Sequence, residues 1–157
     1  MSRLEVGQQA PDFTLESTEG TITLSQLLKD TDMGVVVYFY PKAMTPGCTT
    51  EACDFRDNLN TLKAQGYTVV GISPDKISSL ENFRDKHSLN FPLASDPDKK
   101  VLEEWGAFGE RKIYGKTSLG VIRSTVVISP NGTVKLPEYN VKAKGHVAKL
   151  RKDLGID

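Results

Sequence analysis

The chain of 157 residues contains only two cysteines, Cys48 and Cys53, and both lie in the stretch PKAMTPGCTTEAC. A thiolate is the nucleophile of cysteine redox chemistry, and two nearby thiols can form a reversible disulfide. The spacing of five residues is wider than the C-x-x-C spacing of common dithiol redox loops. A second interpretation stays open, because a free cysteine is often simply a small buried side chain.

Cys48 follows a buried apolar run and stands near the expected start of a helix. Thr45 suits the N-cap position, and Pro46 suits the first helical position. The positive end of the helix dipole favours the thiolate form of a cysteine in the first turn. This setting favours a reactive thiol at Cys48 over a packed one.

An intact helix keeps the two cysteines apart. Five residues of α-helix separate two Cα atoms by about 8.6 Å, whereas a disulfide needs roughly 4.4–6.8 Å. A Cys48–Cys53 bridge therefore requires the first turns to unwind, and we expect a bridged form to be unwound between Thr45 and Phe55. Alternatively, Cys53 only packs beside Ala52 and Phe55.

Arg123 is the other unusual residue, because it interrupts the apolar run GVIRSTVVI. Strand alternation predicts that Arg123 shares one face with Thr125 and Val127. A charge inside a core strand must be paired, since burying it alone is costly. A Cys48 thiolate and Glu51 are the candidate partners. If Arg123 instead lies at a strand end, its side chain reaches solvent or a surface carboxylate.

Hydrophobic patterns predict the elements that must position these residues. Continuous β-branched and aromatic runs predict buried strands at residues 34–40, 67–73 and 121–129. Apolar residues at helical spacing predict a long helix that ends near Gly66. Shorter helices are expected at 24–28 and 78–87, within 97–106, and near the C-terminus at 147–154. Further strands are expected around 13–15 and 22–24, within 90–96, and at 133–139.

The order of these elements predicts the fold class. Strand–helix–strand crossovers give a parallel centre, hairpins add antiparallel strands, and helices cover both faces of the sheet. The prediction is an α/β fold of the thioredoxin type, with a central mixed sheet and an N-terminal β-hairpin extension. One domain spans residues 1–157. The segment GAFGERKIYGKTSLG is predicted as a surface loop near the site.

Composition narrows the function classes. Twenty basic and twenty acidic residues cancel, so no nucleic-acid partner is expected. The longest apolar run is far shorter than the ~20 residues of a membrane helix. The N-terminus lacks the apolar core of a signal peptide, so a reducing cytoplasm is the expected compartment. His87 and His146 do not form zinc spacing with the cysteines, so no metal or other cofactor is expected.

Pro41, Thr45 and Cys48 form P-x-x-x-T-x-x-C, which with the later Arg123 resembles the peroxiredoxin signature. This resemblance covers nearly the whole chain. The chain is similar to the peroxiredoxin Q group, also called bacterioferritin comigratory proteins. The matching segments are APDFTL, FYPK, TPGCTTEACDFRD, VVGISPD, SDPDKKVLEEWG and YGK…G…RSTVVI. The resemblance implies a thiol peroxidase that reduces hydrogen peroxide and alkyl hydroperoxides.

The resemblance also implies roles for five residues at the site of peroxide attack. Cys48 would be the peroxidatic cysteine, which becomes a sulfenic acid. Thr45 and Arg123 would hydrogen-bond the peroxide and the developing charge. Pro41 would shield the site from water, and Glu51 would orient the arginine.

The resemblance assigns Cys53 as the resolving cysteine, which would form an intramolecular disulfide with Cys48. Thioredoxin, or a glutaredoxin-like donor, would then reduce the bridge. A monomer is the expected oligomeric state. The five-residue spacing fits this cycle, because the thiols stay apart during peroxide reduction and meet after local unfolding.

Two positions depart from the pattern of the group. Ala43 and Met44 stand where many relatives carry an acidic residue and an asparagine. These apolar replacements remove no catalytic group, and we expect them to alter loop mobility, the pKa of the thiol or the preference for bulkier alkyl hydroperoxides. Met44 is itself a candidate for oxidation by peroxide.

Two other functions fit the same fold class. A thiol–disulfide oxidoreductase would use the cysteines without a peroxide, but the chain lacks C-x-x-C and leaves Arg123 without a role. A peroxidase is expected to fail in an insulin reduction assay, which separates these two functions. A thioredoxin-like interaction domain with two packed cysteines would make Pro41, Thr45 and Arg123 coincidental.

Overall fold

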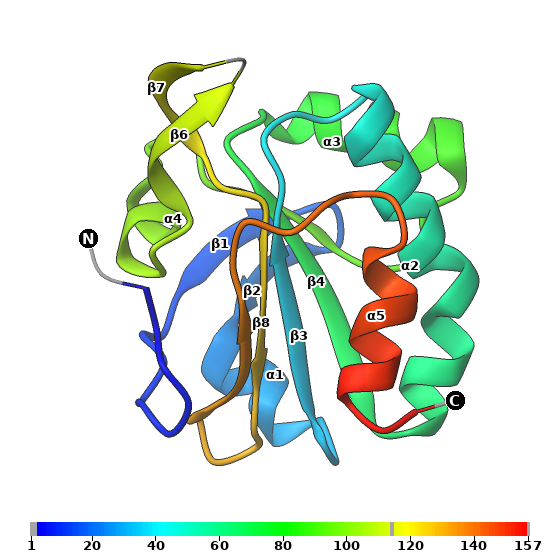
Figure 1. Cartoon of the computed structure of the whole chain (residues 1–157). Helices are drawn as coiled ribbons and strands as arrows, with labels where there is room; N and C mark the ends of the chain where they lie inside the picture. The colour runs from blue at the N-terminus through cyan, green and yellow to red at the C-terminus, as the bar shows by residue number, and fades with distance from the viewer. Residues whose placement is uncertain (1–2, 114, 157) are drawn as a thin grey trace.

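The computed structural model describes residues 3–113 and 115–156, and Figure 1 shows their arrangement. The strands are β1 (Thr14–Ser17), β2 (Gly20–Thr23), β3 (Gly34–Phe39), β4 (Tyr67–Ser73), β5 (Leu93–Ser95), β6 (Phe108–Ile113), β7 (Lys116–Val121), β8 (Ser124–Ile128) and β9 (Val134–Glu138). The helices are α1 (Leu24–Lys29), α2 (Pro46–Ala64), α3 (Ile77–His87), α4 (Lys100–Glu104) and α5 (His146–Asp153). Within these residues, no helix has both the length and the apolar character that crossing a membrane requires.

A mixed sheet of seven strands forms the centre, in the order β2-β1-β5-β4-β3-β8-β9. Strand β3 pairs in parallel with β4, and β4 pairs in parallel with β5. Strand β8 pairs antiparallel with β3, and β9 pairs antiparallel with β8. The sheet and its helical layers confirm the predicted α/β fold of the thioredoxin type, including the N-terminal hairpin of β1 and β2.

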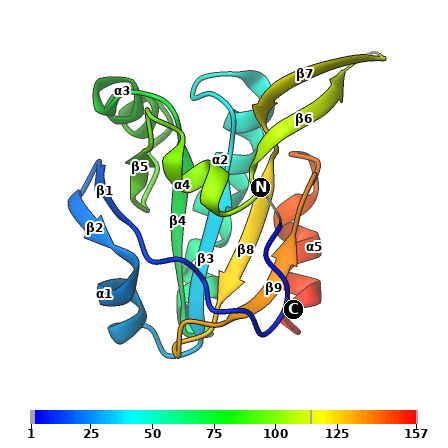
Figure 2. The same ribbon diagram turned by 90° about the vertical axis from the view of Figure 1, so that its left-hand side faces the viewer.

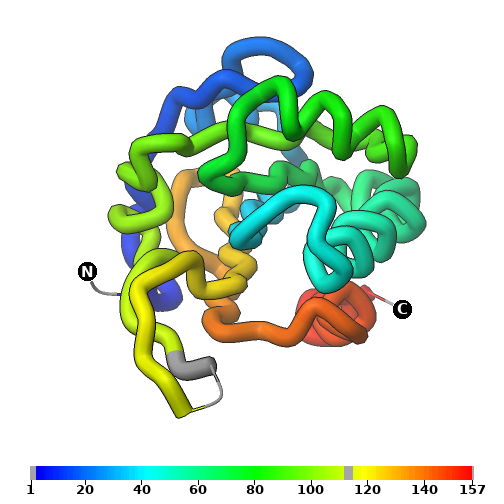
Figure 3. Tube along the Cα trace, turned by 90° about the horizontal axis from the view of Figure 1, so that it is seen from above, coloured from blue at the N-terminus to red at the C-terminus, as the bar shows by residue number. Residues whose placement is uncertain are grey.

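Helices cover both faces of the sheet (Figures 2 and 3). Helices α2, α3 and α5 pack on one face, and α1 and α4 pack on the other. Strand β3 contributes side chains to the cores on both faces of the sheet, since every residue of it is buried. Its alternate side chains Val36 and Tyr38 point to the α2 layer, whereas Val37 and Phe39 point to the α4 layer. This two-sided burial explains why its sequence is apolar throughout.

The predicted strand at 121–129 is wrong in one respect, because the structure divides it. Strand β7 ends at Val121 and β8 begins at Ser124. Between them the backbone leaves the strand pairing, and the Ile122 amide donates a hydrogen bond to the carbonyl of Ala107 at 2.7 Å. Arg123 therefore lies in the break before β8 rather than inside a continuous strand.

The predicted surface loop at residues 106–120 is also wrong. Strands β6 and β7 pair as an antiparallel hairpin, with Phe108 opposite Val121, and the hairpin projects from the body of the molecule (Figure 2). The glycines of this segment interrupt the apolar alternation from which a strand is predicted. At Gly120 a Cβ atom would lie only 2.6 Å from Nε of Arg111, so the absent side chain makes room for the arginine. Tyr114, which also carries part of the family resemblance, lies outside the described residues.

Candidate active site

Cys48 lies in the first turn of α2, directly beyond the end of β3. Thr45 occupies the N-cap position and Pro46 opens the helix, as the sequence predicts. The Thr45 side chain does not cap the helix, however: its Oγ1 donates to the carbonyl of Lys42 at 2.7 Å. Cys48 is buried, with 1% of its surface exposed. A hydroxyl has two acceptor lone pairs, so Thr45 keeps acceptor capacity for a further partner.

Arg123 joins Cys48 and Glu51 through one guanidinium group. Its Nη2 donates to Cys48 Sγ at 3.2 Å, and its Nη1 donates to Glu51 Oε1 at 2.6 Å. Residues three positions apart lie on one side of a helix, so a single arginine reaches both partners. The planar guanidinium suits this double contact, because its donors are held in a fixed fork.

The charges of this cluster are largely removed from water. The Glu51 side chain is fully buried, and 17% of the Arg123 side chain is exposed. Burial raises the pKa of Glu51 to about 7, and the attraction of Arg123 only partly opposes this rise. Burial alone lowers the pKa of Arg123, but Glu51 and Cys48 together bring it above its usual value. Arg123 therefore stays cationic, and its positive charge lies against Cys48 Sγ.

Two tyrosines extend the polar cluster into the core. The hydroxyls of Tyr38 and Tyr40 and the Oε2 atom of Glu51 are buried, and none has a hydrogen-bond partner within the described residues. Burial raises the pKa of both tyrosines, with further contributions from Glu51 and Cys48. Both hydroxyls are therefore neutral at physiological pH, and neither tyrosine adds an anion to the group formed by Cys48, Glu51 and Arg123.

The loop before α2 is held by Asp75, a residue that sequence reasoning missed. Its Oδ2 accepts hydrogen bonds from the Ala43 amide at 2.7 Å and from Ser73 Oγ at 2.8 Å. Ala43 is buried, whereas Met44 is 43% exposed with φ at +71°. Asp75 follows the carboxyl end of β4, beside the carboxyl end of β3. That position in a parallel sheet was the available signal, since loops at such ends meet.

A second segment, residues 140–145, lies against the start of α2. The Val141 amide donates to the carbonyl of Arg123 at 2.9 Å. A Cβ atom on Gly47 would lie 3.4 Å from Arg123 Nη2 and 3.7 Å from the Ala143 side chain. Both distances are ordinary van der Waals contacts, so this segment and Arg123 pack against the start of α2 without depending on the missing side chain of Gly47.

His146, at the start of α5, is buried behind this segment. Its Nε2 hydrogen-bonds with Thr125 Oγ1 at 2.7 Å. Burial lowers its pKa to about 4, and the nearby charges of Lys149 and Arg123 act in the same direction. The imidazole is neutral at physiological pH and has a structural partner. Within residues 3–113 and 115–156, no group of three or more His, Cys, Asp or Glu side chains is placed to hold a metal ion.

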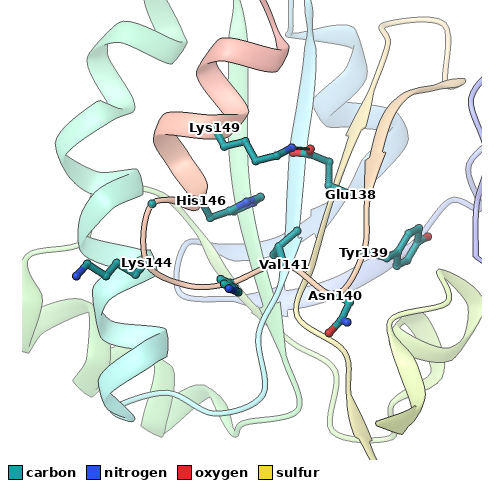
Figure 4. A pocket seen from close by; sticks show the side chains of 9 residues that line it. Glu138, Tyr139, Asn140, Val141, Lys144, His146 and Lys149 are labelled. Carbon is teal, nitrogen blue, oxygen red and sulfur yellow. Dashed lines mark hydrogen bonds and ion pairs between the residues drawn. The ribbon is translucent and has the colours of Figure 1, made fainter. Parts of the chain in front are cut away.

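A hollow of about 350 Å³ lies between this segment and α5 (Figure 4). The ion pair between Glu138 and Lys149 crosses it at 2.7 Å. Its lining does not include Cys48, Thr45 or Arg123. The lining residues are Glu138, Tyr139, Asn140, Val141, Lys142, Lys144, Gly145, His146 and Lys149.

The structure thus brings three of the six predicted site residues into direct contact, Cys48, Glu51 and Arg123. Pro41 is half-buried and begins the loop that Asp75 holds. Cys53 is half-buried in the second turn of an unbroken helix, and both thiols are free. This arrangement corresponds to a reduced protein with the helix intact.

Comparisons with known proteins give a consistent result. The AhpC/TSA family model matches residues 6–136. A Mycobacterium tuberculosis protein with a peroxiredoxin name is 54% identical over 155 residues, which cover 99% of this chain and 98% of that protein. Peroxiredoxin Bcp of Escherichia coli is 42% identical over 146 residues, which cover 93% and 92%.

Two solved structures extend the comparison. A bacterioferritin comigratory protein of Xanthomonas campestris is 35% identical with a TM-score of 0.83, covering 97% of this chain and 96% of that chain. A peroxiredoxin Q mutant of Xylella fastidiosa is 29% identical with a TM-score of 0.87, covering 99% and 98%.

Proposed function

The chain belongs to the AhpC/TSA family and its relatives are peroxiredoxins, thiol peroxidases that need a peroxide and a thiol reductant; from this premise we propose that Cys48 is the peroxidatic residue. The observation that carries the proposal is the 3.2 Å contact between Arg123 Nη2 and Cys48 Sγ at the start of α2. A cation and a helix N-terminus both favour the thiolate, which is the nucleophile.

Peroxide reduction follows from this placement. The Cys48 thiolate attacks one peroxide oxygen, the O–O bond breaks, and the departing hydroxide or alkoxide takes up a proton. The sulfur is oxidised to a sulfenic acid and the peroxide is reduced to water or an alcohol. Arg123 stabilises the charge that develops on the oxygens, because its position is set before the substrate arrives. Thr45 Oγ1, whose own proton goes to the Lys42 carbonyl, accepts a hydrogen bond from the peroxide. Glu51 orients Arg123, and Pro41 limits the access of water.

Cys53 resolves the sulfenic acid in this proposal. The first turns of α2 unwind, the Cys53 thiolate attacks Cys48 sulfur, and an S–S bond forms as hydroxide leaves. A thioredoxin or a glutaredoxin-like dithiol then reduces the bridge by exchange. Because both cysteines lie on α2, one chain completes the cycle and a monomer suffices.

The proposed substrates are hydrogen peroxide and alkyl hydroperoxides. Met44 supports the second class, since its apolar side chain is exposed in the loop that leads to Thr45 and Cys48. The similar Xanthomonas campestris protein is described by its alkyl peroxide reduction activity.

A thiol-labelling gel tests the proposal. Reduced protein is treated with one equivalent of hydrogen peroxide, then labelled with a mass-tagged maleimide, beside Cys48→Ser and Cys53→Ser variants. We expect the wild type to lose both free thiols and neither variant to form an internal bridge. A wild type that keeps both thiols contradicts the assignment of Cys48. If only Cys48 reacts, Cys53 is a packing residue and an external thiol resolves the enzyme.

A further inference from the structure

Arg56 is placed to act on Cys53. It lies three residues further along α2, and residues at this spacing are neighbours on one side of a helix. Side chains of an α-helix lean toward its N-terminus, so that of Arg56 extends over the turn that carries Cys53. Its Nη1 donates to the carbonyl of His87 at 2.6 Å, and its Nε donates to Asp57 Oδ1 at 2.9 Å.

These contacts tie α2 to α3. His87 is the last residue of α3, so the guanidinium occupies a free carbonyl at that helix end. Asn90 adds a weaker contact, as its Nδ2 lies 3.4 Å from the carbonyl of Arg56. On the other side, Arg151 of α5 donates to Asn58 at 2.7 Å. Figure 3 shows α2 between α3 and α5, as these bonds require.

The anchored part of α2 begins directly after Cys53. Phe55 is fully buried and stacks on Tyr38 with the ring centroids 4.4 Å apart. The part before it is attached differently, through the contacts of Arg123 with Cys48 and Glu51. Once the Cys48 thiolate becomes a neutral sulfenic acid, its attraction to Arg123 weakens. The turn that carries Cys48 is then free to unwind while the helix from Phe55 onward stays in place.

The charge of Arg56 also acts on Cys53. The pKa of Arg56 is raised, first by its hydrogen bond to Asp57 and further by the charge of Cys53. Arg56 is 30% exposed along its side chain, so water screens this attraction only in part. The acidic residues Asp54 and Asp57 are close to Cys53 in the sequence and do not supply a positive charge. Arg56 therefore supplies the positive charge that Cys53 needs as a nucleophile.

We propose that Arg56 is the positioning residue of the resolving step: it anchors α2 to α3 directly after Cys53 and sets a positive charge beside that thiol. The inference rests on the proposed function, because it applies only if Cys53 resolves Cys48. In that step the Cys53 thiolate donates its electron pair to Cys48 sulfur, an S–S bond forms, and the S–O bond breaks. Hydroxide leaves and takes up the proton that the Cys53 thiol released on ionising, which forms water, so Cys53 sulfur is oxidised and the sulfenic sulfur is reduced.

Arg84 provides a matched control. It has 31% side-chain exposure, its Nε donates to the following Asp85 at 2.8 Å, and its Nη1 donates to the carbonyl of Thr18 at 3.1 Å. These are the same kinds of bonds that Arg56 makes. Arg84 lies on α3 and its charged neighbours do not include a cysteine.

The experiment compares wild type with Arg56→Met, Arg56→Lys and Arg84→Met. Each reduced protein is mixed with one equivalent of hydrogen peroxide and quenched at intervals with mass-tagged maleimide, while the remaining peroxide is measured in the same samples. Loss of peroxide reports the Cys48 reaction, and loss of both thiols reports bridging. Circular dichroism confirms folding, and Arg56→Gln replaces Arg56→Met if the latter does not fold.

We expect bridging in Arg56→Met to be about fivefold slower, the effect of one partly screened charge, with peroxide loss unchanged. Arg56→Lys recovers most of the rate because it restores the cation, and Arg84→Met bridges like wild type. Equal bridging in Arg56→Met and wild type overturns the inference, as does equal slowing in Arg84→Met. A wild type that consumes peroxide without bridging overturns the role of Cys53 itself, and so marks a failure of the proposed function.

Discussion

Arg123 donates to Cys48 Sγ at 3.2 Å although 75 residues separate the two in the sequence. Sheet geometry explains how they meet. Strand β8 runs antiparallel to β3 with Ser124 opposite Phe39, so the residue before β8 lies beside the end of β3. The loop from that end leads to α2, which begins at Pro46. The fold therefore brings a cation from one strand to the first helical turn that follows its neighbour.

Replacing Arg123 tests the value of this contact. We expect Arg123→Met to lower the rate of peroxide consumption with dithiothreitol by about 10²–10³-fold, the usual cost of one preorganised donor to a developing charge. Arg123→Lys recovers only part of the rate, because an ammonium group cannot contact Cys48 and Glu51 as a planar fork. Arg84→Met is the control for removal of a surface arginine. Full activity in Arg123→Met contradicts the proposed role.

Glu51 gives the folded protein a pH-dependent stability. Its pKa rises from 4.5 to about 7 on folding, so the folded state binds a proton more tightly than the unfolded state. This contribution is complete below pH 4.5 and is lost as the pH rises to about 7. It amounts to at most roughly 3 kcal/mol.

Urea unfolding of wild type and Glu51→Gln between pH 4 and 8 measures this effect. The difference in the free energy of unfolding, wild type minus variant, is expected to fall across that window. A difference that stays level with pH shows that Glu51 does not titrate there.

Segments with a strong apolar pattern predict the helices and strands of the chain well. Segments with a weak apolar pattern are predicted wrongly, for physical reasons. Strand β3 is apolar at every position because both of its faces are covered, and such a run has few alternatives. The β6–β7 hairpin instead carries alternating charges and glycines, so neither face has an apolar signature. Arg123 was predicted inside a strand because local alternation does not reveal where backbone hydrogen bonds change partner.

The candidate site was predictable only where residue type carries the chemistry. Cys48 and Arg123 stand out because a thiol at a helix start and a charge in an apolar run are each unusual. Asp75 does not stand out, because an aspartate after a strand is ordinary. Its role depends on loops that approach each other only in the folded chain.

The backbone of Met44 predicts a stabilising substitution. Its φ of +71° lies in the left-handed region, which costs an L-residue other than glycine roughly 1–2 kcal/mol. Glycine adopts this conformation freely but loses more entropy on folding, so Met44→Gly is expected to stabilise the protein by roughly 0.5–1 kcal/mol. Thermal unfolding measures the change. A lower melting temperature in Met44→Gly shows that contacts of the methionine outweigh the strain.

The side chain of Met44 predicts a change in substrate preference. Asparagine tolerates the left-handed region, so Met44→Asn keeps the loop and removes the apolar surface. We expect its rate with cumene hydroperoxide to fall about fivefold relative to its rate with hydrogen peroxide, as expected from the loss of ~1 kcal/mol of apolar contact. Identical rate ratios in wild type and variant contradict a role for Met44 in binding alkyl groups.

Formation of the bridge predicts a local change in α2. The intact helix from Pro46 to Ala64 holds the two Cα atoms about 8.6 Å apart, beyond the roughly 4.4–6.8 Å that a disulfide spans. We expect amides from Gly47 to Asp54 to exchange with deuterium much faster in the bridged protein, because their helical hydrogen bonds are broken. Amides after Phe55 keep their protection, since the anchored part of α2 does not move. Cys53→Ser treated with peroxide is the control, and its helix is expected to stay protected. Slow exchange from Gly47 to Asp54 in a protein shown by mass to contain the bridge contradicts this coupling of disulfide formation to unwinding.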